Sequence, residues 1–373
     1  MTGDIGAIFQ YSAPVFSSGG SMLARGRFIV LVLFCTLFQP HLAVATNFQS
    51  SLPMPQLTGK LVYHTYKSYG DGSAQLYLYD FAQGSLRRLS QPSWNIIDPM
   101  NADISADGST IVFMGIQDQA WNIFMWRLDS EQLPVNLTKS HGETMNEDPK
   151  FSADGKNIVF KRSGEIYQME VRRNVLSVVA PRAQDKILSM PYLSADSSLL
   201  YFSVGDESAA SVYVKDLKTN SIAEIDSTPG SRAYYPIVRH DGTLFYTRHV
   251  SGTDDADQIY MKGPAGPPRP VIFNDPESDN SDPAPVEDHY LIYSNTSESE
   301  KYQLVLGDLD TGERWSLSPL GLNLSEDVSK LGARYWAPHP KILVRQKLQI
   351  LEIRFGRVMR VVRVMLNRDR DDF

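Results

Sequence analysis

The chain alternates short apolar runs with polar turns, and this pattern recurs along most of its length. The clearest unit runs from Asn146 to Phe160, where two apolar runs flank Asp154-Gly155. This dipeptide predicts a tight turn between two strands, because Gly accepts a positive φ and Asp can bond to the backbone two residues on. A near copy, Asp98 to Phe113, lies 47 to 50 residues upstream. Self-similarity at this period indicates a propeller or a solenoid.

Six such units can be marked between residues 60 and 340, each with four strand-like runs except the first, which has three. One further strand candidate, Leu331 to Trp336, follows the sixth unit. We expect it to pair with Lys60 to Tyr66, because a radial array of sheets must close or leave an edge exposed. The sequence thus predicts an all-β fold: a six-bladed β-propeller of four-stranded antiparallel blades, in which a C-terminal strand completes blade one.

The repeated pattern Asp-Pro-x-Phe-Ser-x-Asp-Gly-x-x-Ile-Val-Phe, at Asp148 to Phe160 and in weaker form at Asp98 to Phe113, resembles the WD40-like repeat of TolB-type β-propellers. The resemblance covers residues 59 to 336 and implies a propeller over 59–339. This kind of propeller occurs in translocation proteins, peptidase propeller domains and some polysaccharide lyases, so function has to be argued from the site. The sequence contains no Gly-x-Ser-x-Gly, so we expect no α/β-hydrolase peptidase domain.

Residues 1–45 have the pattern of a secretory signal peptide. A basic segment, Met22 to Arg27, precedes an apolar run from Phe28 to Phe38, and Ala43 to Ala45 forms a small-x-small end with expected cleavage after Ala45. A membrane anchor is the alternative, but the run is about half of the ~20 residues that span a bilayer. Residues 1–21 contain Asp4 and no basic residue, so Met22 is the expected start. Residues 46–58 are a linker.

Cysteine usage agrees with export. The only cysteine, Cys35, lies in the apolar run, so the mature chain would contain no disulfide. An exported protein without disulfides is typical of a bacterial periplasmic or secreted protein.

Residues 46–339 and the tail after them differ in charge. Residues 46–339 contain 25 Lys and Arg against 38 Asp and Glu, which disfavours nucleic acid as a partner. The tail, residues 340–373, has nine basic and four acidic residues among many apolar ones. It is either an amphipathic helix at an anionic lipid surface or a non-native end. We expect membrane contact through this tail alone, and a monomer.

In a propeller, the loops that enter the first strands and those that follow the second strands open on one face, around the channel. Four residues are the candidate ligand-binding rim there: Asn146, Glu147, Tyr235 and Arg334. Three aspartates precede proline at one repeat position, namely Asp98, Asp148 and Asp282. They serve either the blade's own turn or a divalent cation at the channel mouth; we expect no other cofactor, because metal-binding motifs are absent from the sequence.

Two functions fit these residues. The first is a non-catalytic exported propeller that binds a protein segment or a polysaccharide at its channel face. The second is a lyase that cleaves uronate-containing glycans by β-elimination. In the lyase, His64, His249 or Tyr234 would act as base and acid, and Arg162 or Arg248 would neutralise the uronate carboxylate. Hydrogen-bonded loop histidines are the structural alternative for His64 and His249.

Overall fold

The structure is a computed structural model. It describes residues 50 and 52–338, except 143, 183–185, 206–208, 227, 251–255 and 323–326. The predicted signal peptide and the tail from residue 339 lie outside the described residues. In the described part of the chain, no helix is long and apolar enough to cross a membrane.

Four sheets contain four antiparallel strands each. The first consists of β24 (Ser329–Trp336), β1 (Lys60–Tyr66), β2 (Gln75–Asp80) and β3 (Ser85–Arg88). The second consists of β4 (Ile97–Ile104), β5 (Thr110–Gln117), β6 (Ala120–Arg127) and β7 (Val135–Asn136). The third consists of β8 (Asn146–Phe151), β9 (Asn157–Arg162), β10 (Glu165–Glu170) and β11 (Val175–Ala180). The fourth consists of β20 (Asn280–Val286), β21 (Tyr290–Asn295), β22 (Gln303–Asp308) and β23 (Arg314–Ser316).

A fifth sheet contains eight strands, in the order β12-β13-β14-β16-β17-β18-β19, with β15 paired to β14. Its strands are β12 (Ile187–Leu193), β13 (Leu199–Gly205), β14 (Ala210–Asp216), β15 (Ile222–Asp226), β16 (Ser231–Val238), β17 (Leu244–Val250), β18 (Gln258–Lys262) and β19 (Arg269–Pro270). Three short 3₁₀ helices lie in loops, namely η1 (Pro92–Trp94), η2 (Lys139–His141) and η3 (Ser318–Leu320).

The predicted count of six four-stranded blades is therefore wrong, because four blades are separate four-stranded sheets and the fifth sheet is larger. The cause is local. β15 pairs with Val212 to Lys215 of β14 and leaves the start of that strand uncovered. There, Ala210 pairs in parallel with Arg232 of β16, and this one bridge joins what the sequence pattern treats as two units.

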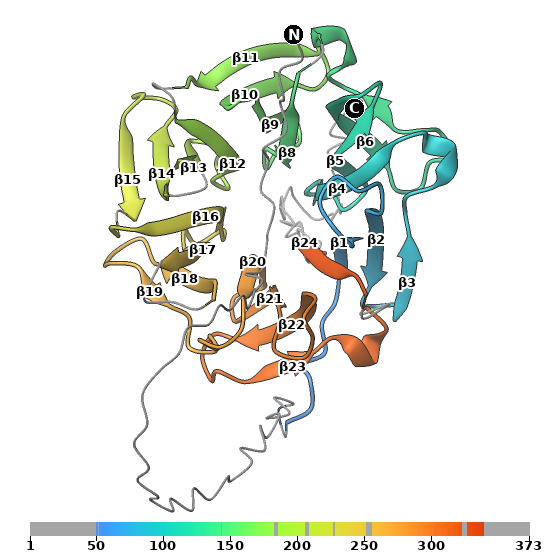
Figure 1. Cartoon of the computed structure of the whole chain (residues 1–373). Coiled ribbons are helices and arrows are strands. Elements are labelled where there is room, and N and C mark those ends of the chain that lie inside the picture. The colour runs from blue at the N-terminus through green and yellow to red at the C-terminus, as the bar shows by residue number, and fades with distance from the viewer. Residues whose placement is uncertain are drawn as a thin grey trace, which may run out of the picture. The chain divides into compact units, whose positions relative to one another are not determined.

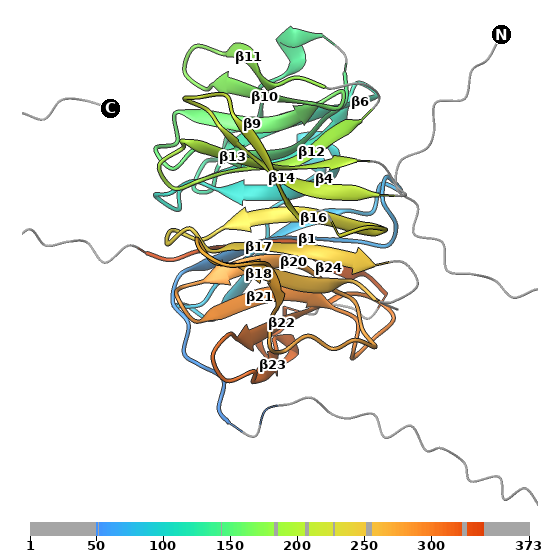
Figure 2. The same cartoon turned by 90° about the vertical axis from the view of Figure 1, so that its left-hand side faces the viewer.

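The sheets are arranged around a common centre, with their first strands innermost (Figure 1). These innermost strands contact one another in the closed order β4, β8, β12, β16, β20 and β24. β24 pairs antiparallel with β1, from Lys60 opposite Trp336 to Tyr66 opposite Ser329. This pairing confirms the prediction that the last strand completes the first sheet. Figure 1 shows β24 beside β1, and Figure 2 shows the same sheets in the view turned by 90°.

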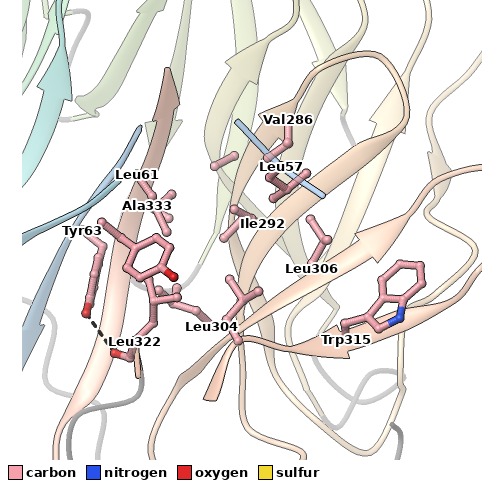
Figure 3. Packing of buried hydrophobic residues seen from close by; sticks show 13 residues of the cluster. Leu57, Leu61, Tyr63, Val286, Ile292, Leu304, Leu306, Trp315, Leu322 and Ala333 are labelled. Atoms are coloured by element: carbon pink, nitrogen blue, oxygen red, sulfur yellow. Dashed lines mark hydrogen bonds between the residues drawn. The ribbon is translucent and has the colours of Figure 1, made fainter. Parts of the chain in front are cut away.

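Apolar side chains fill the spaces between neighbouring sheets. The cluster beside the closure combines residues from both ends of the described chain: Leu57, Leu61 and Tyr63 pack with Ala333 and with residues of β20 to β23 (Figure 3). The Tyr63 hydroxyl donates a hydrogen bond of 2.8 Å to the Leu322 carbonyl. Burial of each large apolar side chain contributes about 1.5–3 kcal/mol, so this cluster holds the ring closed.

The same irregularity recurs in all six innermost strands. At one equivalent position in each strand, where the register shifts, a residue adopts a left-handed φ of 49° to 60°, and in five cases proline follows it. β4 contains a second residue with left-handed φ, Asn101, at 52°. The six residues at the equivalent position are Asp98, Asp148, Met190, Tyr235, Asp282 and Gly332. A β-bulge of this kind re-aims a side chain, so the six positions form a ring at the centre of the molecule.

Gly332 provides a test of the closure. A Cβ at this position would lie 2.7 Å from the His64 ring, and its φ is +60°. We expect Gly332→Ala to lower the free energy of unfolding by at least about 2 kcal/mol, from backbone strain of about 1 kcal/mol plus the clash. Urea unfolding measures this. The control is Gly321→Ala, because Gly321 has φ +75° but open space around it and should lose only the strain term. Equal losses for the two variants would contradict the role of close packing at Gly332.

Candidate functional site

The centre of the ring is nearly filled by side chains. It leaves a cavity of about 10 Å³, lined by residues of the innermost strands: Asn101, Ala102, Asp148, Lys150, Met190, Pro191, Tyr235, Pro236, Asp282, Gly332 and Arg334. This volume is at the lower limit for a single water molecule. This cavity therefore admits nothing larger than a water molecule, and a larger ligand has to bind outside it.

The three aspartates that precede proline all have polar partners near the channel. Asp98 accepts hydrogen bonds of 2.9 Å from the backbone of Gly72 and Ala74. Asp148 accepts one of 2.7 Å from the Asn101 amide. Asp282 Oδ2 accepts one of 2.9 Å from the Gly332 backbone N–H. Each of these bonds connects neighbouring sheets.

Buried charges of both signs share the channel. Burial raises the pKa of Asp282 to about 6, and its Oδ1 has no hydrogen-bond donor among the described residues. Burial and the Arg334 guanidinium lower the pKa of Lys150 to about 8. The Lys150 ammonium donates to the Pro149 carbonyl at 3.0 Å, and Arg334 Nη1 donates to the Ala333 carbonyl at 2.7 Å. Within the described ranges, no group of three or more His, Cys, Asp or Glu side chains is arranged to bind a metal.

His64 is buried in this interior rather than placed on the face. It lies over Gly332, and its Nδ1 accepts a hydrogen bond of 3.4 Å from the Asn101 backbone. Burial lowers the pKa of His64 to about 3, and the positive charges of Arg334 and Lys150 act in the same direction. The imidazole is therefore neutral at physiological pH and, at 2% exposure, is covered by protein.

Asn146 and Arg162 form a hydrogen-bonded pair at the start of the third sheet. The buried Asn146 amide donates to the carbonyls of Trp121 and Thr144, both at 2.9 Å, and accepts a bond of 2.8 Å from Arg162. A second guanidinium nitrogen of Arg162 donates to the His141 carbonyl. These contacts fix the loop that enters β8 and use the polar atoms of the Asn146 side chain.

Glu147 connects the third sheet to the first. Its carboxylate lies 2.6 Å from the Lys161 ammonium and accepts a 3.1 Å hydrogen bond from the Tyr69 hydroxyl. Tyr69 stacks on Trp121 with ring centroids 5.5 Å apart. Burial, together with the negative charge of Glu147, raises the pKa of Tyr69. The contact between Tyr69 and Trp121 has no signal in the sequence pattern, because it joins a loop of the first sheet to strand β6 of the second.

Partly buried apolar residues surround this connection. Tyr66, Tyr69, Ile116 and Met145 pack on a buried core that includes Trp121. Ile97, which pairs with Ile116, is 55% exposed. All five lie at one edge of the sheets: at the start of a first strand or just before it, at the end of a second strand, or in the loop after it. We call these five residues the channel-face patch.

The proposed lyase residues of the eight-stranded sheet lie on different sides of β17. His249 Nδ1 is 3.6 Å from Asp257 Oδ1, and the Tyr234 hydroxyl donates to the same carboxylate. Burial and the charge of Asp279 raise the pKa of Asp257.

Arg248 instead points to Asp226 Oδ2, at 3.3 Å, and its guanidinium lies 3.5 Å from the Tyr260 ring centroid. Adjacent residues on a strand face opposite sides of the sheet, so His249 and Arg248 do not meet. Arg162 belongs to the third sheet, where it is hydrogen-bonded to Asn146. Tyr235 lines the central cavity, and its ring centroid lies 5.4 Å from that of Tyr234. The described residues thus do not bring His249 together with Arg248 or Arg162.

The fold is that of a TolB-like β-propeller. The structure is similar to TolB from Acinetobacter baumannii, with a TM-score of 0.58 and 16% identity over 75% of this chain and 67% of that one. It is similar to a putative TolB from Agrobacterium tumefaciens, with a TM-score of 0.52 and 12% identity over 75% and 99%. A chain of a nidogen/laminin complex has a TM-score of 0.56 and 9% identity over 75% and 99%. At these identities the likeness concerns the fold alone.

Sequence comparison adds one partial relative. No family model matches the chain. The uncharacterized protein Atu1656 of Agrobacterium fabrum is 31% identical over 112 residues, which are 29% of this chain and 35% of that protein. The match thus spans about a third of the curated relative.

Asp282 gives a pH-dependent prediction. Its folded pKa of about 6 exceeds the ordinary 3.8, so the folded state holds the proton more tightly. The stability that this proton contributes is complete below pH 4 and is lost as pH rises through 6. We expect the free energy of unfolding of the wild type to fall, relative to that of Asp282→Asn, by roughly 2–3 kcal/mol between pH 4 and pH 7, because the asparagine has no proton to lose.

Urea unfolding across this pH range measures the shift. The control is Asp129→Asn, which removes an exposed carboxylate and should give a difference that changes little with pH. A pH-independent difference for Asp282→Asn would show that the buried carboxyl does not titrate in this interval.

Proposed function

We propose that this chain is an exported propeller that binds an extended protein segment at its channel face. The observation that carries the proposal is the channel-face patch, in which the exposed Ile97 and four partly buried aliphatic and aromatic side chains lie beside a central cavity lined by buried charges. Apolar groups gathered on a surface favour a protein partner, because burial of each one on binding removes its area from water.

A protein segment fits this patch better than a polysaccharide. Sugar rings bind on exposed aromatic faces with polar groups around them, whereas the Trp121 indole is buried under Tyr69 and the most exposed member is Ile97. The β-elimination alternative requires a base and a carboxylate-neutralising cation in one pocket, and His249 and Arg248 lie on opposite faces of β17.

Charge and fold narrow the partner further. Residues 46–339 have 13 more acidic than basic side chains, so a segment that combines apolar and basic residues is favoured electrostatically. The fold is shared with a chain of a nidogen/laminin complex, which is support by analogy. The signal-peptide pattern of residues 22–45 supports an interaction in the bacterial periplasm or outside the cell.

The probe for this proposal is a phage-displayed library of random dodecapeptides, selected against the whole protein. We expect selected peptides to lose at least tenfold in affinity for Ile97→Asp/Met145→Asp, because two apolar contacts are replaced by carboxylates, at a cost above about 1.4 kcal/mol. Fluorescence anisotropy with the synthetic peptides measures the dissociation constants.

The matched control is Ile272→Asp, which places the same charge on an isoleucine that is 59% exposed beside the β22–β23 turn. It should leave peptide affinity unchanged. Equal losses in the control, or a library that yields no binder, would contradict the proposal. Release of unsaturated products from a uronate polysaccharide, followed by absorbance, would favour the lyase instead.

A further inference from the structure

The outer strands of the sheets differ in how their open edges are protected. An outer strand presents unpaired backbone groups, and short length, charge and proline normally prevent other strands from adding to it. β7 and β19 have two residues each, and β23 has three. β3 ends in Arg87 and Arg88, and β15 contains Glu224 and Asp226.

β11 has none of these protections. It has six residues, Val-Leu-Ser-Val-Val-Ala, and is thus the longest outer strand among the described residues, with no charge and no proline. Val175 is 54% exposed and Val178 is 45% exposed. β-branched residues at an open edge are the composition that accepts another strand.

Basic residues stand at both ends of this apolar strand. Arg172 and Arg173 lie in the turn before it, and Arg182 follows it, all three exposed. Glu170, 3.5 Å from Arg173, and Glu165, which accepts a 3.1 Å hydrogen bond from the Arg182 backbone N–H, offset two of these charges. The Lys215 ammonium adds another near the C-terminal end, 2.6 Å from the Val179 carbonyl. The edge is therefore locally positive on a body that is acidic overall.

This charge pattern favours some partner strands over others at the open edge of β11. In an antiparallel pair of two copies of β11, Arg172 and Arg173 of one copy would lie beside Arg182 of the other, and like charges opposite one another destabilise a pair. A strand with acidic ends would instead place opposite charges there.

We propose that β11 is a docking edge for an extended strand of a partner protein, apolar in its centre and acidic at both ends. The partner strand continues the third sheet by backbone hydrogen bonds, and the arginines fix its register. The site is separate from the channel-face patch and does not depend on it.

The probe is a labelled peptide, Glu-Glu-Val-Thr-Val-Thr-Val-Glu-Glu, titrated into the whole protein and followed by fluorescence anisotropy. We expect saturable binding that weakens at least tenfold in Arg172→Glu/Arg173→Glu and in Val178→Lys, and that weakens with added salt. The same peptide with lysine in place of glutamate should not bind.

The matched control is Arg87→Glu/Arg88→Glu, which makes the same charge change on another outer strand and should leave binding unchanged. Circular dichroism and thermal unfolding verify that each variant is folded. If Val178→Lys unfolds, Arg172→Glu/Arg173→Glu still tests the proposal, because it leaves the residues of β11 unchanged.

Three outcomes would overturn the proposal. If neither peptide binds, the arginines serve only to protect the edge from other strands. If both peptides bind equally, the arginines do not select a partner strand with acidic ends. Sedimentation that shows a wild-type dimer, lost in Val178→Lys, would make a second copy of this chain the occupant.

Discussion

The rest of the structure depends on the antiparallel pairing of β24 with β1. A ring of radial sheets has no intrinsic end, so the first and last strands must pair or expose two edges to water. Here, the pairing runs the length of β1, from Lys60 to Tyr66, and an apolar cluster from both ends of the described chain packs beside it. Gly332 is part of this closure, because the absence of a Cβ lets the His64 ring lie over it.

The left-handed bulge in each innermost strand decides what the centre contains. It directs Asp98, Asp148 and Asp282 toward neighbouring sheets, where backbone and amide donors meet them. Lys150 and Arg334 supply positive charge in the same space, and almost no volume remains. A closed centre leaves the loops around it as the surface for binding, and the channel-face patch lies there.

Local sequence chemistry predicted much of the fold. Asp-Gly turns between apolar runs predicted the strand pairs of the second and third sheets, and the pairing of Leu331 to Trp336 followed from the missing first strand. The blade count failed because one bridge, between Ala210 and Arg232, joins two units. A single non-local backbone contact has no counterpart in a repeat pattern, which records periodicity and turns.

The candidate site was less predictable than the fold. The alternation of side chains along a strand predicts that the neighbours Arg248 and His249 point to opposite faces of the sheet. It could not have shown that His249 lies beside Asp257, which precedes the neighbouring strand β18, or that the Asn146 amide donates hydrogen bonds inward to Trp121 and Thr144.

The sequence by itself thus determined the strands, their turns and the closing strand, because these depend on side-chain periodicity and on backbone preferences within a few residues. Only the tertiary structure decided which polar groups are buried together. The low pKa of His64, the raised pKa of Asp282 and the apolar patch beside Glu147 all arise where loops and strands distant in sequence meet. Burial and charge proximity are properties of that arrangement in space.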